Sequence, residues 1–212
     1  MMKKMKKIVF GLLGFFLVLP AVCLGATDWY DTLNTGVTYV SNLDVKYNEL
    51  GFSDSQKCEY GAGYSVGFAF GNIIEPIRFE GEVSCGHNEF ERVDRGSILS
   101  GYSLETSQQN FMFNGYFDFN SDSSFTTYLT VGAGFSRVEG DINLVPMSDE
   151  FYDTVFTYQI GAGVGYVINE IMTMDFRYRF LSAADPEFGY PGETVEAKIF
   201  SHNLTIGVHM AF

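Results

Sequence analysis

The strongest constraint on the fold is a two-residue alternation of side-chain type that runs to the end of the chain. Between residues 204 and 212 every second residue is large and apolar, and the last of them is Phe212. The residues between them are small or polar. A period of two places successive side chains on opposite faces of an extended strand. This segment is therefore predicted to be a β-strand with one apolar and one polar face.

Alternation of this kind marks eight segments after Thr27, the C-terminal one included, and the connections between them are alternately long and short. Each segment is long enough for the roughly nine to eleven tilted residues with which a strand crosses a bilayer. An even number of such strands predicts an all-β, eight-stranded antiparallel up-and-down transmembrane β-barrel. The expected strands cover residues 32–42, 57–70, 76–88, 104–119, 125–138, 154–167, 171–182 and 197–212.

The N-terminus has the composition of a secretory leader. Four lysines precede an apolar run, Ile8 to Val22, which Pro20 interrupts. The run is shorter than the ~20 residues of a spanning helix and fits the apolar part of a signal peptide. We expect residues 1–25 to be a cleaved signal peptide and residues 26–212 to form the barrel domain. Lipidation at Cys23 is a less favoured alternative.

The chain is acidic, with 26 Asp and Glu residues against 13 Lys and Arg residues and a formal net charge of −13. Without the four lysines of the leader, 13 − 4 = 9 basic residues remain, and the charge becomes 9 − 26 = −17. Such a charge repels the phosphate backbone, so we expect no nucleic-acid partner. No His, Cys and carboxylate cluster has the spacing of metal ligands, and we expect neither a metal nor a cofactor.

Two of the expected strands turn charged side chains toward the interior. The residues are Arg78, Glu80 and Glu82 on one strand and Asp175, Arg177 and Arg179 on the other. Strands four apart in a ring of eight lie on opposite walls, so these charges are expected to meet in the lumen. We expect Glu80 at the height of Arg177, and Glu82 at the height of Arg179. Because buried ions need partners, a structural plug is the main interpretation, and a gated pore is the alternative.

A soluble eight-stranded barrel is the structural alternative to a membrane barrel. It would have an apolar interior and a polar exterior, because water lies outside and an apolar ligand inside. Here charged and glycine-rich faces alternate with continuous aromatic and aliphatic rows. A sandwich of two sheets would expose those charges to water. The pattern therefore favours the membrane barrel.

Two cysteines remain after the leader, and secretion would place them in an oxidising compartment. If Gly71-Asn72 is a two-residue hairpin turn, the register sets Cys58 directly opposite Cys85. A disulfide between Cys58 and Cys85 is therefore predicted. A four-residue turn at the same place would put His87 opposite Cys58 and leave the cysteines diagonal.

The surroundings of the histidines decide whether the chain could carry a hydrolytic site. His202 is expected on the outward face, but its neighbours on that face, Phe200 and Leu204, offer no nucleophile. Ser201 is expected to point into the barrel, away from His202. Without a nucleophile beside the base, we expect no enzymatic activity. His209 is expected inside the lumen, where hydrogen bonds would satisfy it.

The last two expected strands carry a family resemblance. Residues 171–180 end in Arg-Tyr-Arg-Phe, and residues 202–212 end in Gly-Val-His-Met-Ala-Phe. Here the chain resembles the small outer-membrane β-barrels of the opacity-protein and OmpA/OmpX-like group. The C-terminal assembly signal of such barrels has a polar residue, a glycine, an apolar residue and an aromatic residue at set spacing. Those places are filled by Thr205, Gly207, Met210 and Phe212.

The resemblance implies a non-enzymatic, structural and surface-exposed protein in the outer membrane of a Gram-negative bacterium. Its implied partners are outer-membrane lipid and lipopolysaccharide, the barrel-assembly machinery and a host or cell-surface partner bound through the acidic outer loops. We expect a monomer. Solvation alone accounts for acidic loop tips, and cation bridging to lipopolysaccharide or adhesion to a basic partner is the alternative. The alternative overall function is a small passive, porin-like channel.

Overall fold

The computed structural model describes residues 28–41, 43–49, 52–93, 104–119, 123–144, 147–184, 187–188, 195–196 and 199–212. These residues contain twelve strands that are joined in one sheet. In the part of the chain that is described, no helix is both long enough and apolar enough to cross a membrane.

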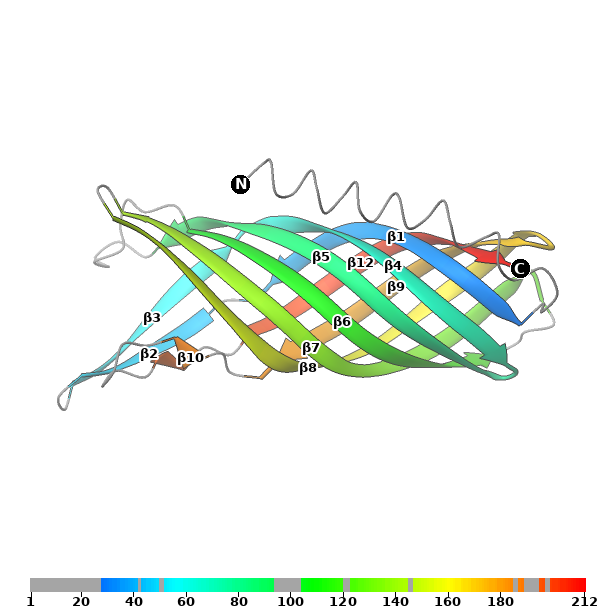
Figure 1. The fold of residues 1–212 in the computed structure, drawn as a ribbon, viewed down its shortest axis with the longest axis horizontal. Helices are drawn as coiled ribbons and strands as arrows, with labels where there is room; N and C mark the ends of the chain where they lie inside the picture. Colours follow the sequence, from blue (N-terminus) through cyan, green and yellow to red (C-terminus); the bar gives the residue numbers. More distant parts are fainter. Residues whose placement is uncertain are drawn as a thin grey trace.

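Eight of the strands form a closed antiparallel barrel, whose tilted strands surround one long axis in Figure 1. In chain order they are β1 (Trp29–Val40), β4 (Ala62–Ile74), β5 (Ile77–Val93), β6 (Leu104–Phe119), β7 (Phe125–Leu144), β8 (Met147–Asn169), β9 (Met172–Ala183) and β12 (Ile199–Ala211). Consecutive strands of this set pair with each other, and β1 also pairs with β12, which closes the ring. The predicted eight-stranded antiparallel barrel is confirmed.

The alternation puts opposite chemistry on the two faces of the barrel wall. On β9, Phe176 and Tyr178 are 47% and 43% exposed, whereas Arg177 between them is 3% exposed. Similar rows of exposed Phe, Tyr, Leu, Val and Ile side chains lie on the outer face of the other barrel strands. An apolar exterior around a polar interior is what a bilayer requires and is the opposite of a soluble barrel.

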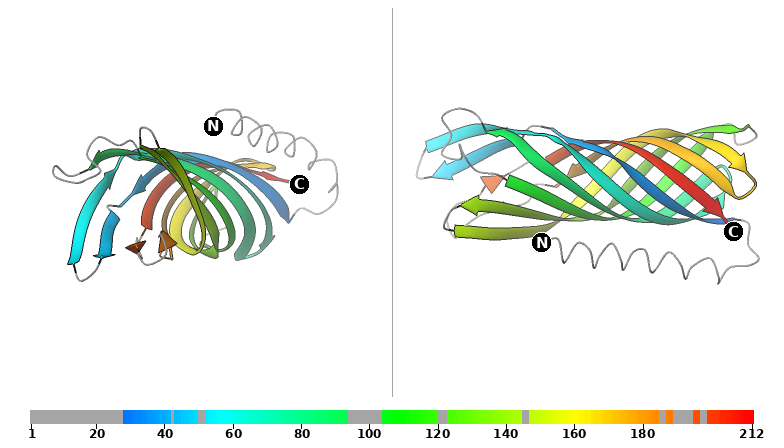
Figure 2. Two further views of the ribbon diagram at one scale, coloured as in Figure 1. Left: turned by 60° about the vertical axis from the view of Figure 1, so that its left-hand side comes forward. Right: turned by 90° about the horizontal axis from the view of Figure 1, so that it is seen from above.

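The barrel has two unlike ends. At the turn end, short connections join β4 to β5, β6 to β7 and β8 to β9, and the first residue of β1 lies near the last of β12. The opposite end, called the loop end, carries the longer segments. There β2 (Leu43–Glu49) and β3 (Phe52–Tyr60) form a hairpin, which projects beyond the barrel wall in Figure 2. The two-residue strands β10 (Glu187–Phe188) and β11 (Val195–Glu196) extend this small sheet through β2.

Two of the long connections between the expected strands are paired instead. Residues 43–56 lie largely in the β2–β3 hairpin. Residues 139–144 belong to β7 and residues 147–153 to β8, and the two strands stay paired as far as Leu144 and Met147. The cross-strand ladder therefore continues well past the membrane-spanning alternation that set the expected strand ends.

The predicted turn at Gly71-Asn72 is wrong, because β4 runs on to Ile74 and the chain reverses at Glu75-Pro76. Proline has no N–H to donate to a ladder, so the strand ends before Pro76. Gly71 lies inside the strand for a packing reason. A Cβ atom on Gly71 would lie 2.5 Å from Cζ of Tyr30, which points inward from β1.

The later turn separates the two cysteines, so the predicted disulfide is wrong. Cys85 faces Val66 across the β4–β5 hairpin. Cys58 lies in β3, outside the barrel wall, where it pairs with Leu43 and Val93. Cys85 is a free thiol.

A charged network in the barrel lumen

The six predicted lumen charges come from β5 and β9, which lie opposite each other in the closed ring. All six side chains are buried. On the neighbouring strand β8, Gly161, Gly163 and Gly165 stand directly beside Arg179, Arg177 and Asp175. The lumen of an eight-stranded barrel is only wide enough for side chains, so small residues beside long charged ones leave the charged side chains room.

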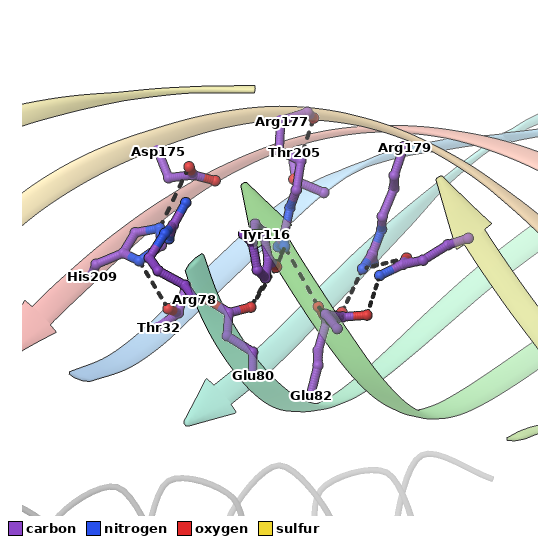
Figure 3. A network of polar contacts seen from close by, with 12 residues as sticks. Thr32, Arg78, Glu80, Glu82, Tyr116, Asp175, Arg177, Arg179, Thr205 and His209 are labelled. Carbon is purple, nitrogen blue, oxygen red and sulfur yellow. Dashed lines mark hydrogen bonds and ion pairs between the residues drawn. The ribbon is translucent and has the colours of Figure 1, made fainter. Parts of the chain in front are cut away.

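Two glutamates and two arginines meet across the lumen (Figure 3). Nη1 of Arg179 lies 2.5 Å from Oε1 of Glu82. Nη1 of Arg177 lies 3.7 Å from Oε2 of Glu82 and 3.9 Å from Oε2 of Glu80. Arg177 thus lies between both glutamates. The sequence pattern predicts each glutamate at the height of one arginine and paired with that arginine alone.

Tyrosines complete the coordination of Glu80, and sequence reasoning missed them. Tyr30 donates its hydroxyl hydrogen to Oε1 of Glu80 at 2.9 Å. Tyr116 donates to Oε2 of Glu80 and accepts a hydrogen bond from Nη1 of Arg177. The signal was present for Tyr116, which falls on the polar face of an alternating strand. Tyr30 lies outside the expected first strand, which begins at residue 32.

Arg78 and Asp175 form their ion pairs with residues other than the two glutamates and two arginines described above. Arg78 donates from Nε and Nη2 to the two carboxylate oxygens of Asp118, at 2.7 and 2.9 Å. Its guanidinium carbon lies 4.6 Å from the ring centre of Tyr116 and 4.9 Å from that of Tyr128, within cation–π range.

Asp175 is held by groups from two other strands. It accepts a hydrogen bond of 2.6 Å from the Tyr128 hydroxyl, and Nε2 of His209 lies 3.4 Å from its Oδ1 atom. Nδ1 of His209 contacts the hydroxyl of Thr32 at 3.3 Å. His209 therefore lies in the lumen, as expected, and links β12 to β1 and β9.

Neutral polar side chains continue the network toward the loop end. Asn114 donates to Oε2 of Glu82 at 3.2 Å and accepts a hydrogen bond of 2.5 Å from Gln159. Beyond them, Ser136 and Thr157 form a hydrogen-bonded chain with Asn110. Polar contacts between nearby strands thus line the lumen at several successive levels.

Some buried polar atoms in this region have no protein partner. They include Nε and Nη2 of Arg177, Nε of Arg179, the hydroxyl of Thr130 and both amide atoms of Asn34. No group of three or more His, Cys, Asp or Glu side chains in the described ranges is arranged to hold a metal ion.

The histidines of the outer wall make local contacts. Nδ1 of His202 lies 2.8 Å from the Tyr178 hydroxyl, while the neighbouring Ser201 is buried on the inner face. Nδ1 of His87 lies 3.3 Å from the hydroxyl of Ser107, its cross-strand neighbour, a contact that sequence reasoning missed.

The four residues of the expected assembly signal are divided between the two faces of β12 and its end. Thr205 and Gly207 are buried on the inner face. Met210 lies opposite Asp31 of β1. The backbone N–H of Phe212 donates to the carbonyl of Trp29 at 3.0 Å, and its ring lies 6.1 Å from that of Phe70. Phe212 thus completes the β1–β12 seam at the turn end.

Comparison with known proteins agrees with this architecture. The family model described as outer membrane protein beta-barrel domain matches residues 14–212. Outer membrane protein PagN of Salmonella typhimurium is 23% identical over 180 residues, which cover 75% of either chain.

Solved structures show the same fold. OprG from Pseudomonas aeruginosa is similar with a TM-score of 0.57 and 13% identity, covering 88% of this chain and 97% of OprG. Neisserial surface protein A has a TM-score of 0.52 and 17% identity, covering 87% of this chain and 97% of its own. Because the family model spans nearly the whole chain, the protein belongs to the outer membrane protein β-barrel domain family and lies in the outer membrane of a Gram-negative bacterium.

Proposed function

We propose that the protein is a non-enzymatic surface protein, in which a plugged barrel anchors the loop-end hairpins outside the cell. The observation that carries the proposal is the charge network, because Glu80, Glu82, Arg177 and Arg179 join opposite walls of the lumen. Long side chains held by charge-assisted hydrogen bonds fill the space that a solute would need.

Single-channel recording in a planar bilayer tests the plug. We expect the refolded barrel to give no regular conductance steps in concentrated salt, whereas a porin refolded in parallel gives them. Uniform steps from the native protein would overturn the proposal.

A small passive channel is the second candidate function, and one observation favours it. Arg177, Thr130 and Asn34 carry polar atoms without protein partners in an otherwise polar lumen, and such groups are commonly satisfied by water. A continuous water path would conduct ions. The same recordings therefore separate the two candidates.

The β7–β8 hairpin is the element best placed to act at the surface. Pairing of β8 with β9 stops at Thr157, whereas its pairing with β7 continues to Met147. The hairpin thus extends past β9 and carries Asp141, Asp149 and Glu150 in sequence. We infer that it offers an acidic surface to a cationic partner or to a divalent cation bridging lipopolysaccharide.

Two variants test the hairpin. Replacement of residues 141–150 by a two-residue Asn-Gly turn should preserve the barrel, because residues 140 and 151 face each other in the ladder. We expect expressing cells to lose adhesion to a polycationic surface. The triple variant Asp141→Asn, Asp149→Asn, Glu150→Gln keeps the hairpin and should lose adhesion to the same extent. Full adhesion by both variants would exclude this hairpin as the adhesive element.

Three further expectations accompany this function. We propose that residues 1–25 are removed as a signal peptide, that the barrel-assembly machinery engages the C-terminal signal, and that the barrel is monomeric. The basic and apolar leader supports the first proposal. The seam position of Phe212 supports the second. Mass spectrometry of the membrane-extracted protein measures both its N-terminus and its oligomeric state.

A further inference from the structure

The acidic side chain of Asp31 belongs to the outer face of β1 rather than to the lumen. Its neighbours Tyr30 and Thr32 point inward, where they contact Glu80 and His209. Strand alternation therefore directs Asp31 outward, toward the membrane. Asp31 is nevertheless only 4% exposed, and its Oδ1 atom has no hydrogen-bond partner. Burial of a carboxylate oxygen without a partner is costly, so a cation beside Oδ1 would stabilise Asp31.

Aromatic side chains lie near this position on the same face of the wall. Asp31 lies directly opposite Phe70 on β4 and Met210 on β12. The Trp29 and Phe70 rings are stacked with centroids 5.0 Å apart, and the Phe212 ring lies 6.1 Å from that of Phe70. Together Asp31, Trp29, Phe70 and Phe212 form what we call the seam cage. Aromatic faces beside a carboxylate are suited to an ammonium group, which gains cation–π and charge-assisted hydrogen-bond energy.

The seam cage lies at the turn end of the wall, where Trp and Phe side chains mark the boundary between bilayer and water. We propose that it binds the primary ammonium of a phospholipid headgroup of the ethanolamine type. A bilayer supplies such headgroups at this level, and their positive charge complements Asp31. A quaternary ammonium would meet the rings but could donate no hydrogen bond to the carboxylate.

The chain contains its own reporter, because Trp29 is its only tryptophan. The full chain is refolded in micelles and titrated with brominated phosphatidylethanolamine or with brominated phosphatidylcholine of the same acyl chains. Both lipids are zwitterionic, so the net charge of the protein does not favour either. We expect the ethanolamine lipid to quench Trp29 at about one-tenth of the concentration that the choline lipid requires, as a hydrogen bond between charged groups implies.

Asp31→Asn should remove the preference, and the two lipids should then quench alike. Asp28→Asn is the matched control, since it removes one acidic charge from the same end without altering the cage. Heat-modifiable mobility on gels verifies that each variant has folded. Equal quenching of the native protein by both lipids overturns the proposal without any variant. A preference that survives Asp31→Asn, or that Asp28→Asn also abolishes, overturns it too.

Discussion

Each buried charge in the lumen relies on partners from several strands. Glu82 of β5 contacts Arg177 and Arg179 of β9 as well as Asn114 of β6. The removal of one member leaves the others desolvated without compensation, which costs more than the pair contributes. The contribution of these residues to stability is therefore measured by combining single and double substitutions.

Glu82→Gln is expected to lower the free energy of unfolding by about 3–5 kcal/mol, because Arg179 would stay buried without its counterion. The double variant Glu82→Gln, Arg179→Met should lose less than the sum of the single losses. Urea unfolding of the refolded barrel in micelles measures the free energy of unfolding of both single variants and of the double variant.

The exposed pair Arg137–Glu139 is the matched control for this cycle. Its atoms are 3.0 Å apart, but both side chains are nearly half exposed. We expect a coupling of less than about 1 kcal/mol there. Strictly additive losses for Glu82 and Arg179 would show that the opposite walls are not coupled.

Neighbouring barrel strands match small residues to large ones. Gly163 of β8 lies between Tyr128 of β7 and Arg177 of β9. A Cβ atom on Gly163 would stand 2.3 Å from the Tyr128 hydroxyl oxygen and 2.6 Å from the backbone carbonyl oxygen of Phe176. The backbone contact cannot be relieved by a rotamer change.

Gly163→Ala should therefore destabilise the barrel by about 1–3 kcal/mol, as overpacking does, and should weaken the Tyr128–Asp175 hydrogen bond. Gly81→Ala serves as the control, because no atom lies within 4 Å of its added Cβ. We expect the control to stay within about 0.5 kcal/mol of the native protein. Equal losses in urea unfolding would contradict the packing argument.

The end of β12 is the element that closes the ring. Phe212→Ser removes the ring that packs on Phe70 while the backbone bond to Trp29 can remain. We expect most of the variant to accumulate as unassembled periplasmic chain, measured by membrane fractionation and heat-modifiable mobility. Leu204→Ser places the same polar group on the outer face of the same strand and should assemble better. Native levels of inserted Phe212→Ser would refute a role for the terminal aromatic.

The two unlike ends of the molecule predict its orientation in the membrane. Short connections gather at the turn end, and the longer hairpins gather at the loop end. Outer-membrane barrels have short periplasmic turns and longer external loops. The loop end is therefore expected to face outward.

Cysteine labelling of intact cells tests this orientation, in a background where the native cysteines are replaced by serine. Ser148→Cys near the β7–β8 tip should react with an impermeant maleimide, and Ser124→Cys at the turn end should react only after permeabilisation. The reverse labelling pattern would show that the turn end, and not the loop end, faces outward.

Much of this molecule was predictable from local pattern. The two-residue period assigned Glu80, Glu82, Arg177 and Arg179 to the interior, because the face on which a side chain lies depends only on its place in the strand. Charge alternating with apolar rows indicated a membrane barrel, and the eight-fold repetition of that pattern indicated closure.

The partner of each residue was decided only by the tertiary structure. Register depends on where a hairpin turns, and Pro76 moved that turn past Gly71, which set Cys85 opposite Val66 instead of Cys58. Contacts across the lumen depend on the tilt of all eight strands together. That tilt brought Arg177 to both glutamates, and the β5–β6 register brought Arg78 to Asp118. The sequence by itself determined which residues face the lumen, a local property, whereas which residues meet there is a property of the closed ring.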